Sequence, residues 1–149
     1  MARRPAPHSG FTLVEMMVTT FLIALLAATV VLTLPASRAL PREVDRFATR
    51  LDHARDEAII GMRAVRVVVD QAGYRFERQH LGQWEPLVEG PFDPVPWADG
   101  TRPELVSDEP LSFIFDLQGG AGGAGSLALS DGARRLRVAV DPDGEVHVE

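Results

Sequence analysis

A stretch of 22 residues without a charge, from Met16 to Ser37, constrains this chain more than any other feature. Between Met16 and Leu34 the only polar side chains are threonines, whose hydroxyls can bond to a backbone carbonyl one turn earlier. As an α-helix, such a stretch would be about 33 Å long, close to the thickness of a membrane's hydrocarbon core. The segment therefore predicts one membrane-spanning helix. The remainder of the chain, which is rich in charge, Pro and Gly, predicts a soluble head.

The residues before this segment, Met1 to Gly10, form a short leader that carries Arg3 and Arg4. Positive charge keeps that end in the cytoplasm, which sends the head outward. Two ordinary explanations are open: a secretory signal peptide cut after its apolar core, or an uncut signal anchor. Residues 35–37 (Pro-Ala-Ser) make a poor cut site. Neither explanation accounts for Glu15, a carboxylate that would cost about 2–3 kcal/mol toward the membrane centre.

Residues Gly10 to Glu15 read Gly-Phe-Thr-Leu-Val-Glu and lead into the apolar segment. This pattern resembles the prepilin-type cleavage and methylation motif of type IV pilin-like proteins. The resemblance implies that a membrane prepilin peptidase cuts between Gly10 and Phe11 and then methylates the Phe11 amine. Glycine suits this position because it lets a protease approach the backbone closely. The resemblance also implies that Glu15 pairs with the N-terminal amine of a neighbouring subunit, so that each group relieves the other's desolvation.

A second, amphipathic helix is expected from Arg42 to about Ile60, with Gly61 as its stop. Pro35 and Pro41 precede it, and either proline can interrupt a helix. Apolar residues recur at spacings of three and four along one face, which predicts a helix packed on the head. That stripe comprises Leu40, Val44, Phe47, Leu51, Ala54, Ala58 and Met62, and the polar face comprises Arg42, Glu43, Arg46, Arg50, Asp52 and Glu57.

From residue 63 onward the apolar period changes to two, which is typical of strands. One helix followed by many strands indicates an α+β fold. The glycine-rich segment 119–125 and residues 89–110 are expected to be loops, and residues 141–144 a turn. Trp84 is expected in the core, whereas Trp97 fits the core or a partner surface equally well. The expected strands are 63–70, 74–79, 83–87, 111–117, 126–130, 136–140 and 145–149.

The end of the second helix, from Ala54 to Ile59 (Ala-Arg-Asp-Glu-Ala-Ile), and the Val-rich segment after it resemble the minor pseudopilin H family (GspH) of type II secretion systems. Trp84 and the turn at 141–144 also fit that family. The resemblance implies a pilin-like fold, with a long N-terminal helix and an antiparallel β-sandwich-like head. It implies a structural subunit of the periplasmic pseudopilus that drives export of folded proteins across the outer membrane. The alternative is a FimT/FimU-like minor pilin, which primes type IV pilus assembly or takes part in DNA uptake.

The same resemblance implies the partners and the location. The partners would be the major and other minor pseudopilins, the inner-membrane assembly platform and the prepilin peptidase. The chain would consist of a leader (1–10), a transmembrane and assembly helix (11–37) and a periplasmic head (38–149). It would cross the bacterial inner membrane once, with its N-terminus in the cytoplasm.

No pattern in the sequence indicates an enzyme, a cofactor or a metal site. The segment 119–125 lacks the Lys and the Ser or Thr of a phosphate loop. Asp141, Asp143 and Glu145 lack the full twelve-residue calcium pattern. The four histidines show no metal-ligand spacing, and the absence of cysteine removes thiolate ligands.

The charge balance disfavours nucleic acid as a partner. The chain carries 15 basic and 21 acidic residues, for a net charge of −6. Affinity for nucleic acid comes largely from neutralising phosphates, which an acidic head does poorly. Arg134, Arg135 and Arg137 are the only dense basic cluster in the head.

Overall fold

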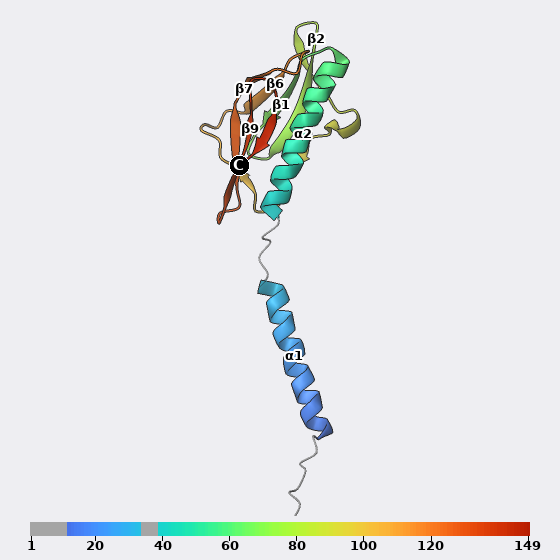
Figure 1. Ribbon diagram of the computed structural model, residues 1–149, viewed down its shortest axis with the longest axis vertical. Coiled ribbons are helices and arrows are strands. Elements are labelled where there is room, and N and C mark those ends of the chain that lie inside the picture. The colour runs from blue at the N-terminus through green and yellow to red at the C-terminus, as the bar shows by residue number, and fades with distance from the viewer. Residues whose placement is uncertain (1–11, 34–38) are drawn as a thin grey trace, which may run out of the picture. The chain divides into compact units, whose positions relative to one another are not determined.

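The computed structural model describes residues 12–33 and 39–149 (Figure 1). The chain divides into two units, Met1–Ser37 and Arg38–Glu149. The first contains one helix, α1 (Leu13–Thr33), and the second is the head. Within the described part of the chain, no helix is both long enough and apolar enough to cross a membrane.

The head begins with helix α2 (Ala39–Gly61), which starts three residues before the expected Arg42. Pro41 lies in the first turn of α2, where its missing N–H would have had no helical partner. The apolar stripe is confirmed up to its last member, because Leu40, Val44, Phe47, Leu51, Ala54 and Ala58 are all buried. Met62 was wrongly assigned to the stripe, since it is 73% exposed.

The C-terminus of α2 shows why Met62 leaves the stripe. Met62 has a positive φ of 48°, so the chain turns into the left-handed region there rather than at Gly61. The N–H of Met62 donates to the Ile59 carbonyl (3.3 Å), and the N–H of Arg63 donates to the Ala58 carbonyl (3.2 Å). These two bonds form a Schellman motif, in which the left-handed position is usually glycine.

Two antiparallel sheets complete the head. The first has the strand order β3-β2-β1-β6-β7, with β4 pairing with one end of β2, and the second has the order β10-β9-β8-β5. Both are antiparallel throughout, which confirms the α+β, pilin-like architecture expected from the sequence. The strands are β1 (Val65–Val69), β2 (Gly73–His80), β3 (Gln83–Pro86), β4 (Val95–Pro96), β5 (Arg102–Pro103), β6 (Leu111–Phe115), β7 (Ala121–Gly123), β8 (Ser126–Ser130), β9 (Arg135–Val140) and β10 (Val146–Val148).

Two segments expected to be loops contribute to the sheets. The glycine-rich segment contains β7, whose residues 121–123 pair with β6. The proline-rich segment contains β4, β5 and a short 3₁₀ helix, η1 (Gly90–Phe92). Strand β7 lacks the alternating apolar residues that identify a strand in sequence, and it is held by backbone hydrogen bonds at a sheet edge.

The core lies between α2 and the sheets, since α2 contacts β1 and β6 of one sheet and β8, β9 and β10 of the other. Phe47 stands at its centre, with edge-on ring contacts to Tyr74 (4.9 Å), Trp97 (5.5 Å) and Phe113 (6.0 Å). Such pairs add about 0.5–1.5 kcal/mol each beyond the area they bury. Phe47 therefore connects the helix to the first sheet.

Arg55 of α2 joins the helix to the turns of both sheets. Its Nε donates to the carbonyl of Gly119, which follows β6, and its Nη2 donates to the carbonyl of Asp143 in the β9–β10 turn, each at 3.1 Å. Hydrogen bonds from a charged donor are stronger than neutral ones. Arg55 thus fixes the C-terminal half of α2 beside both turns.

Candidate functional site

Glu15 lies in the first turn of α1, where it is exposed. The hydroxyl of Thr12 accepts the Glu15 N–H at 3.2 Å, and the Thr12 carbonyl accepts the Met16 N–H at 3.2 Å. Thr12 is therefore the N-cap of α1, and Glu15 stands three residues after it, as in a capping box. The positive end of the helix dipole favours a carboxylate there. The predicted cleavage residues, Gly10 and Phe11, lie outside the described residues.

Sequence reasoning missed Thr12 as a functional neighbour of Glu15. The Thr-Leu-Val-Glu spacing at 12–15 is the pattern that identifies a capped helix start, so the signal was present. Capping fixes where α1 begins and so places Glu15 in its first turn. A change at Thr12 would alter that helix start without removing the carboxylate.

The threonines of α1 satisfy their hydroxyls within the helix. Thr19 donates to the carbonyls of Glu15 (2.9 Å) and Met16 (3.0 Å), and Thr20 donates to Met16 (2.6 Å). This confirms the expected bonding for these two residues and removes the cost of a bare hydroxyl in an apolar setting. Several large apolar side chains of α1 are more than half exposed, namely those of Leu13, Met17, Phe21 and Ile23. They are available to lipid or to other helices.

Glu43 corrects the expected polar face of α2, because it is only 4% exposed. Its two carboxylate oxygens accept hydrogen bonds from Nη2 of Arg46 at 3.0 and 2.8 Å. The hydrogen bond to Glu43 raises the pKa of Arg46. The ion pair with Arg46 thus explains how the carboxylate of Glu43 can be buried, and Glu43 needs no functional role to account for it.

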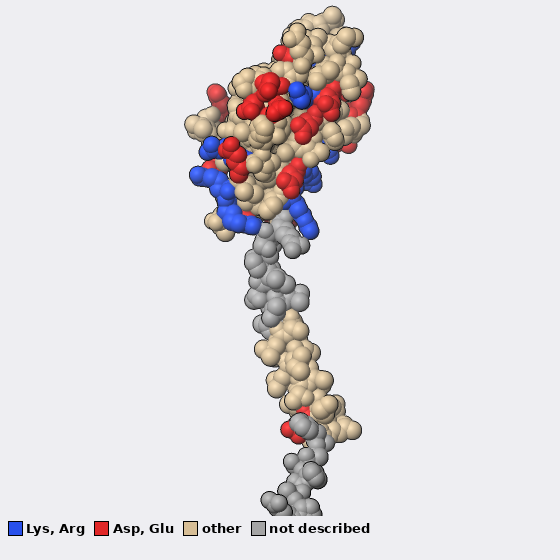
Figure 2. Space-filling view, viewed as in Figure 1, with Lys and Arg blue, Asp and Glu red and all other residues tan. Residues whose placement is uncertain are grey.

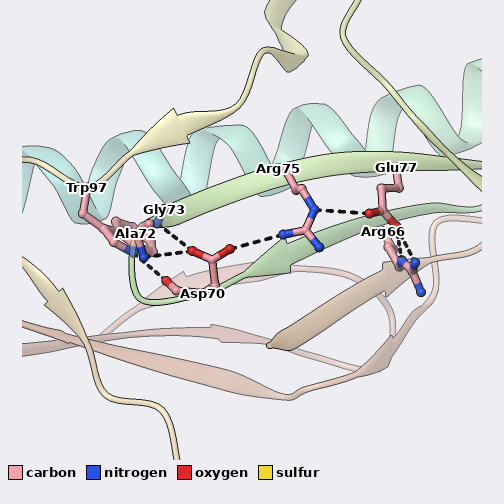
Figure 3. A network of polar contacts seen from close by, with 7 residues as sticks. All are labelled: Arg66, Asp70, Ala72, Gly73, Arg75, Glu77 and Trp97. Carbon is pink, nitrogen blue, oxygen red and sulfur yellow. Dashed lines mark hydrogen bonds and ion pairs between the residues drawn. The ribbon is translucent and has the colours of Figure 1, made fainter. Parts of the chain in front are cut away.

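A chain of polar contacts runs along one side of the first sheet (Figure 3). The carboxylate of Asp70 accepts the backbone N–H groups of Ala72 (2.8 Å) and Gly73 (3.0 Å). Arg75 pairs with Asp70 at 3.2 Å and with Glu77 at 3.3 Å. Glu77 also pairs with Arg66. The network shapes the β1–β2 turn and ties the two strands together.

The two tryptophans differ in burial, which decides the open question about Trp97 and contradicts the prediction for Trp84. Trp97 is 9% exposed, packs against Phe47, and donates its indole N–H to the Asp70 carbonyl at 3.0 Å (Figure 3). Trp84, wrongly expected in the core, is only partly buried and lies under the guanidinium of Arg66, with the cation 4.5 Å from the ring centroid. Trp97 is thus a core residue, and Trp84 contributes to a partly exposed surface.

Two of the three clustered arginines have acidic partners. Arg134 pairs with Asp131 at 2.9 Å, and Arg135 makes a two-pronged pair with Glu104 at 2.7 and 2.8 Å. The Arg134 side chain and the backbone N–H groups of residues 133 and 134 lower the pKa of Asp131. This pairing reduces the positive charge available to a polyanion.

The described residues contain no group of three or more His, Asp or Glu side chains arranged to hold a metal ion. Asp141 lies in the expected β9–β10 turn, where its carbonyl accepts the Gly144 N–H at 2.8 Å and its carboxylate lies 3.0 Å from a ring nitrogen of His147. The polar groups of this turn thus have partners within the hairpin.

A methylation-type N-terminus, an apolar α1, and a head in which one amphipathic helix packs on two antiparallel sheets together define a pilin-like subunit. The motif described as the prokaryotic N-terminal methylation motif matches residues 6–31. The family described as type II transport protein GspH matches residues 43–144. This chain belongs to the GspH family, whose members are structural pseudopilin subunits that associate with other pseudopilins.

Solved structures share the fold. A structure of the minor pseudopilin EpsH from the type 2 secretion system of Vibrio cholerae has a TM-score of 0.61 and 16% identity, over 74% of this chain and 96% of that chain. A second structure of EpsH has a TM-score of 0.56 and 15% identity, over 70% and 89% of the two chains. The type IV minor pilin FimU of Pseudomonas aeruginosa has a TM-score of 0.51 and 15% identity, over 73% and 91%. No curated protein matches the chain.

Proposed function

We propose that this chain is a minor pseudopilin of a type II secretion system. The observation that carries this proposal is the GspH match over residues 43–144, together with the methylation motif that the same chain carries at its N-terminal end. The subunit would cross the inner membrane once through α1, with its N-terminus in the cytoplasm and its head in the periplasm. It would act by assembly and without chemistry of its own.

The proposed organisation is a leader (1–10), an anchoring and assembly helix (11–37) and a head (38–149). Cleavage between Gly10 and Phe11, followed by methylation of Phe11, would leave a mature chain in which α1 begins two residues after the new terminus. The methylation motif supports this cut. The partners would be the prepilin peptidase, the assembly platform, and the major and other minor pseudopilins.

Within this function, Glu15 would pair with the N-terminal amine of an adjacent subunit. Its support is the placement of an exposed carboxylate in the first turn of α1. Glu15→Val is expected to enter the membrane and be processed but to co-purify poorly with the other pseudopilins. Met17→Val, an apolar change two residues along the same helix, is the control and should co-purify normally. Normal assembly of Glu15→Val would contradict the pairing.

The function itself is tested by a clean deletion in the source organism, with culture supernatant and surface pili compared before and after. Loss of secreted proteins, with their accumulation in the periplasm and intact pili, is the expected result. The likeness to FimU favours a second candidate, a minor pilin that primes a type IV pilus. Intact secretion with lost pili would establish that candidate and reject ours.

A further inference from the structure

Five arginines lie toward one end of the head. Arg42 stands in the first turn of α2. Arg102 in β5 is opposite Ser130 in β8, and Ser130 is opposite Arg135 at the start of β9, so the strand register places both arginines in one row. Arg134 and Arg137 flank Arg135 in sequence. We call the surface formed by Arg42, Arg102, Arg134, Arg135 and Arg137 the basic end.

The contacts of α2 show which end of the head this is. Arg55, in the C-terminal half of α2, bonds to the carbonyl of Asp143, so the β9–β10 turn lies beside that half. Strand β9 runs into this turn, and its first residue, Arg135, therefore lies toward the start of α2 (Figure 1). In Figure 2 basic side chains gather at the end of the head where α2 begins, and acidic ones lie over much of the remaining face.

Charge separates this end from the rest of the head. Arg42, Arg102 and Arg137 are exposed and make no ion pair with any of the described residues. The acidic residues within three positions of these five arginines in sequence, or opposite them in the strand register, are Glu43, Asp45, Asp99, Glu104, Asp131 and Glu149, and Glu43 pairs with Arg46. Elsewhere in residues 39–149, apart from Arg46, six arginines stand against fourteen acidic residues. An anionic surface would therefore repel the rest of the head but would meet, at this end, three exposed arginines that have no ion pair among the described residues.

We propose that the basic end rests on anionic phospholipid headgroups while the unassembled subunit is held in the membrane. This inference relies on the proposed anchoring of α1. Ala39 follows Thr33 by six residues, so the start of α2 stays within about 20 Å of the end of α1 on any path. Guanidinium groups bind phosphate oxygens in two-pronged fashion, and their attraction to an anionic surface acts over about one Debye length.

The test uses the full chain in lipid nanodiscs. Because the sequence has no cysteine, Ala133→Cys in the exposed β8–β9 hairpin provides a single labelling site. A fluorophore at this cysteine would be quenched by spin-labelled headgroups when the basic end contacts lipid. We expect more quenching in discs containing phosphatidylglycerol than in phosphatidylcholine discs. Salt should remove the difference, because the Debye length falls from about 10 Å at 0.1 M to about 3 Å at 1 M.

A charge-matched pair of variants tests the location of the contact. Arg102→Ala should lower the ratio of docked to free heads about five-fold, the expected effect of removing one such charge. Arg63→Ala, at an exposed arginine after the far end of α2, removes the same charge and should leave the ratio unchanged. Equal effects of the two changes, or equal quenching in neutral and anionic discs, would overturn the proposal.

Two further outcomes are distinguishable. If the label does not co-elute with the disc scaffold protein, α1 is not an anchor, and the docking proposal fails together with the proposed location. If Arg102→Ala leaves the quenching intact but lowers retention on duplex DNA, the basic end binds nucleic acid and the lipid proposal is wrong.

Discussion

At the residue scale, Met62 occupies a position that favours glycine. Its φ of 48° carries the steric cost of a left-handed conformation, while its side chain is 73% exposed and packs little. Met62→Gly should therefore raise the free energy of unfolding by about 0.5–1 kcal/mol, measured by urea denaturation. Ile60→Gly is the matched control, since Ile60 is 78% exposed but lies inside α2. It should cost about 1 kcal/mol, and a loss of stability in both variants would contradict the Schellman assignment.

Tyr74 gives a residue-scale prediction about pH. Burial raises the pKa of Tyr74 to about 12, with the nearby Arg46 opposing the shift. An unfolded tyrosine has a pKa of about 10, so the contribution of Tyr74 to stability is complete below pH 10 and is lost as pH rises toward 12. Tyrosinate absorbance should show the higher midpoint in the folded protein and about 10 in urea.

The tyrosinate absorbance reports the ionisation of Tyr74 alone, because Tyr74 is the single tyrosine of the chain. Tyr74→Phe is the control and should abolish the absorbance change. A midpoint near pH 10 in the folded protein would mean that the hydroxyl is exposed to solvent.

At the scale of elements, two turn glycines separate backbone strain from steric overlap. Gly132 and Gly144 have φ values of 85° and 81°. A Cβ on Gly132 would meet open space, whereas one on Gly144 would overlap the carbonyl oxygen of Gly119. Gly132→Ala should cost about 1 kcal/mol, and Gly144→Ala about 2–4 kcal/mol, in urea denaturation. Equal costs would mean that the β9–β10 turn does not pack against the segment after β6.

At this scale, most elements could be predicted from the sequence because their apolar residues are periodic. Helix α2 and the strands β1, β2, β6, β8 and β9 carry apolar residues at regular spacing, because each buries one face, and all were expected near their observed bounds. Strand β7 consists of Ala and Gly and has no periodic face, so its pairing is invisible in sequence. Glu43 and Trp84 were misplaced, and Trp97 was left undecided, because burial of a polar or amphipathic side chain depends on contacts that a sequence pattern does not specify.

At the scale of the whole molecule, the candidate site and the head differ in how far sequence can describe them. The motif around Glu15 is local and contiguous, so sequence alone identified its residues. Thr12 was overlooked although its spacing was visible. The basic end contains Arg42, Arg102 and the arginines of residues 134–137. These residues are far apart in sequence and come close together only through the fold and the strand register. No local pattern could have predicted that grouping.

The whole-molecule division into two units yields the last prediction. Every member of the hydrophobic core lies at or after Leu40, so the head contains a complete core without α1. A fragment of residues 38–149 should be soluble, unfold cooperatively and melt within about 2 °C of the head in the full chain, as followed by circular dichroism, since removing residues outside the core changes stability by less than about 0.5 kcal/mol.

A fragment starting at Arg50 is the control for that experiment, because it lacks Leu40, Val44 and Phe47 while keeping every strand. Loss of Phe47 alone should cost about 3–5 kcal/mol, which is a large share of the stability of a domain this size, so the shorter fragment should not fold. If the 38–149 fragment also failed to fold, the head would depend on α1 for its stability. The head could then not fold independently of α1, and the chain would have to be treated as one cooperative unit.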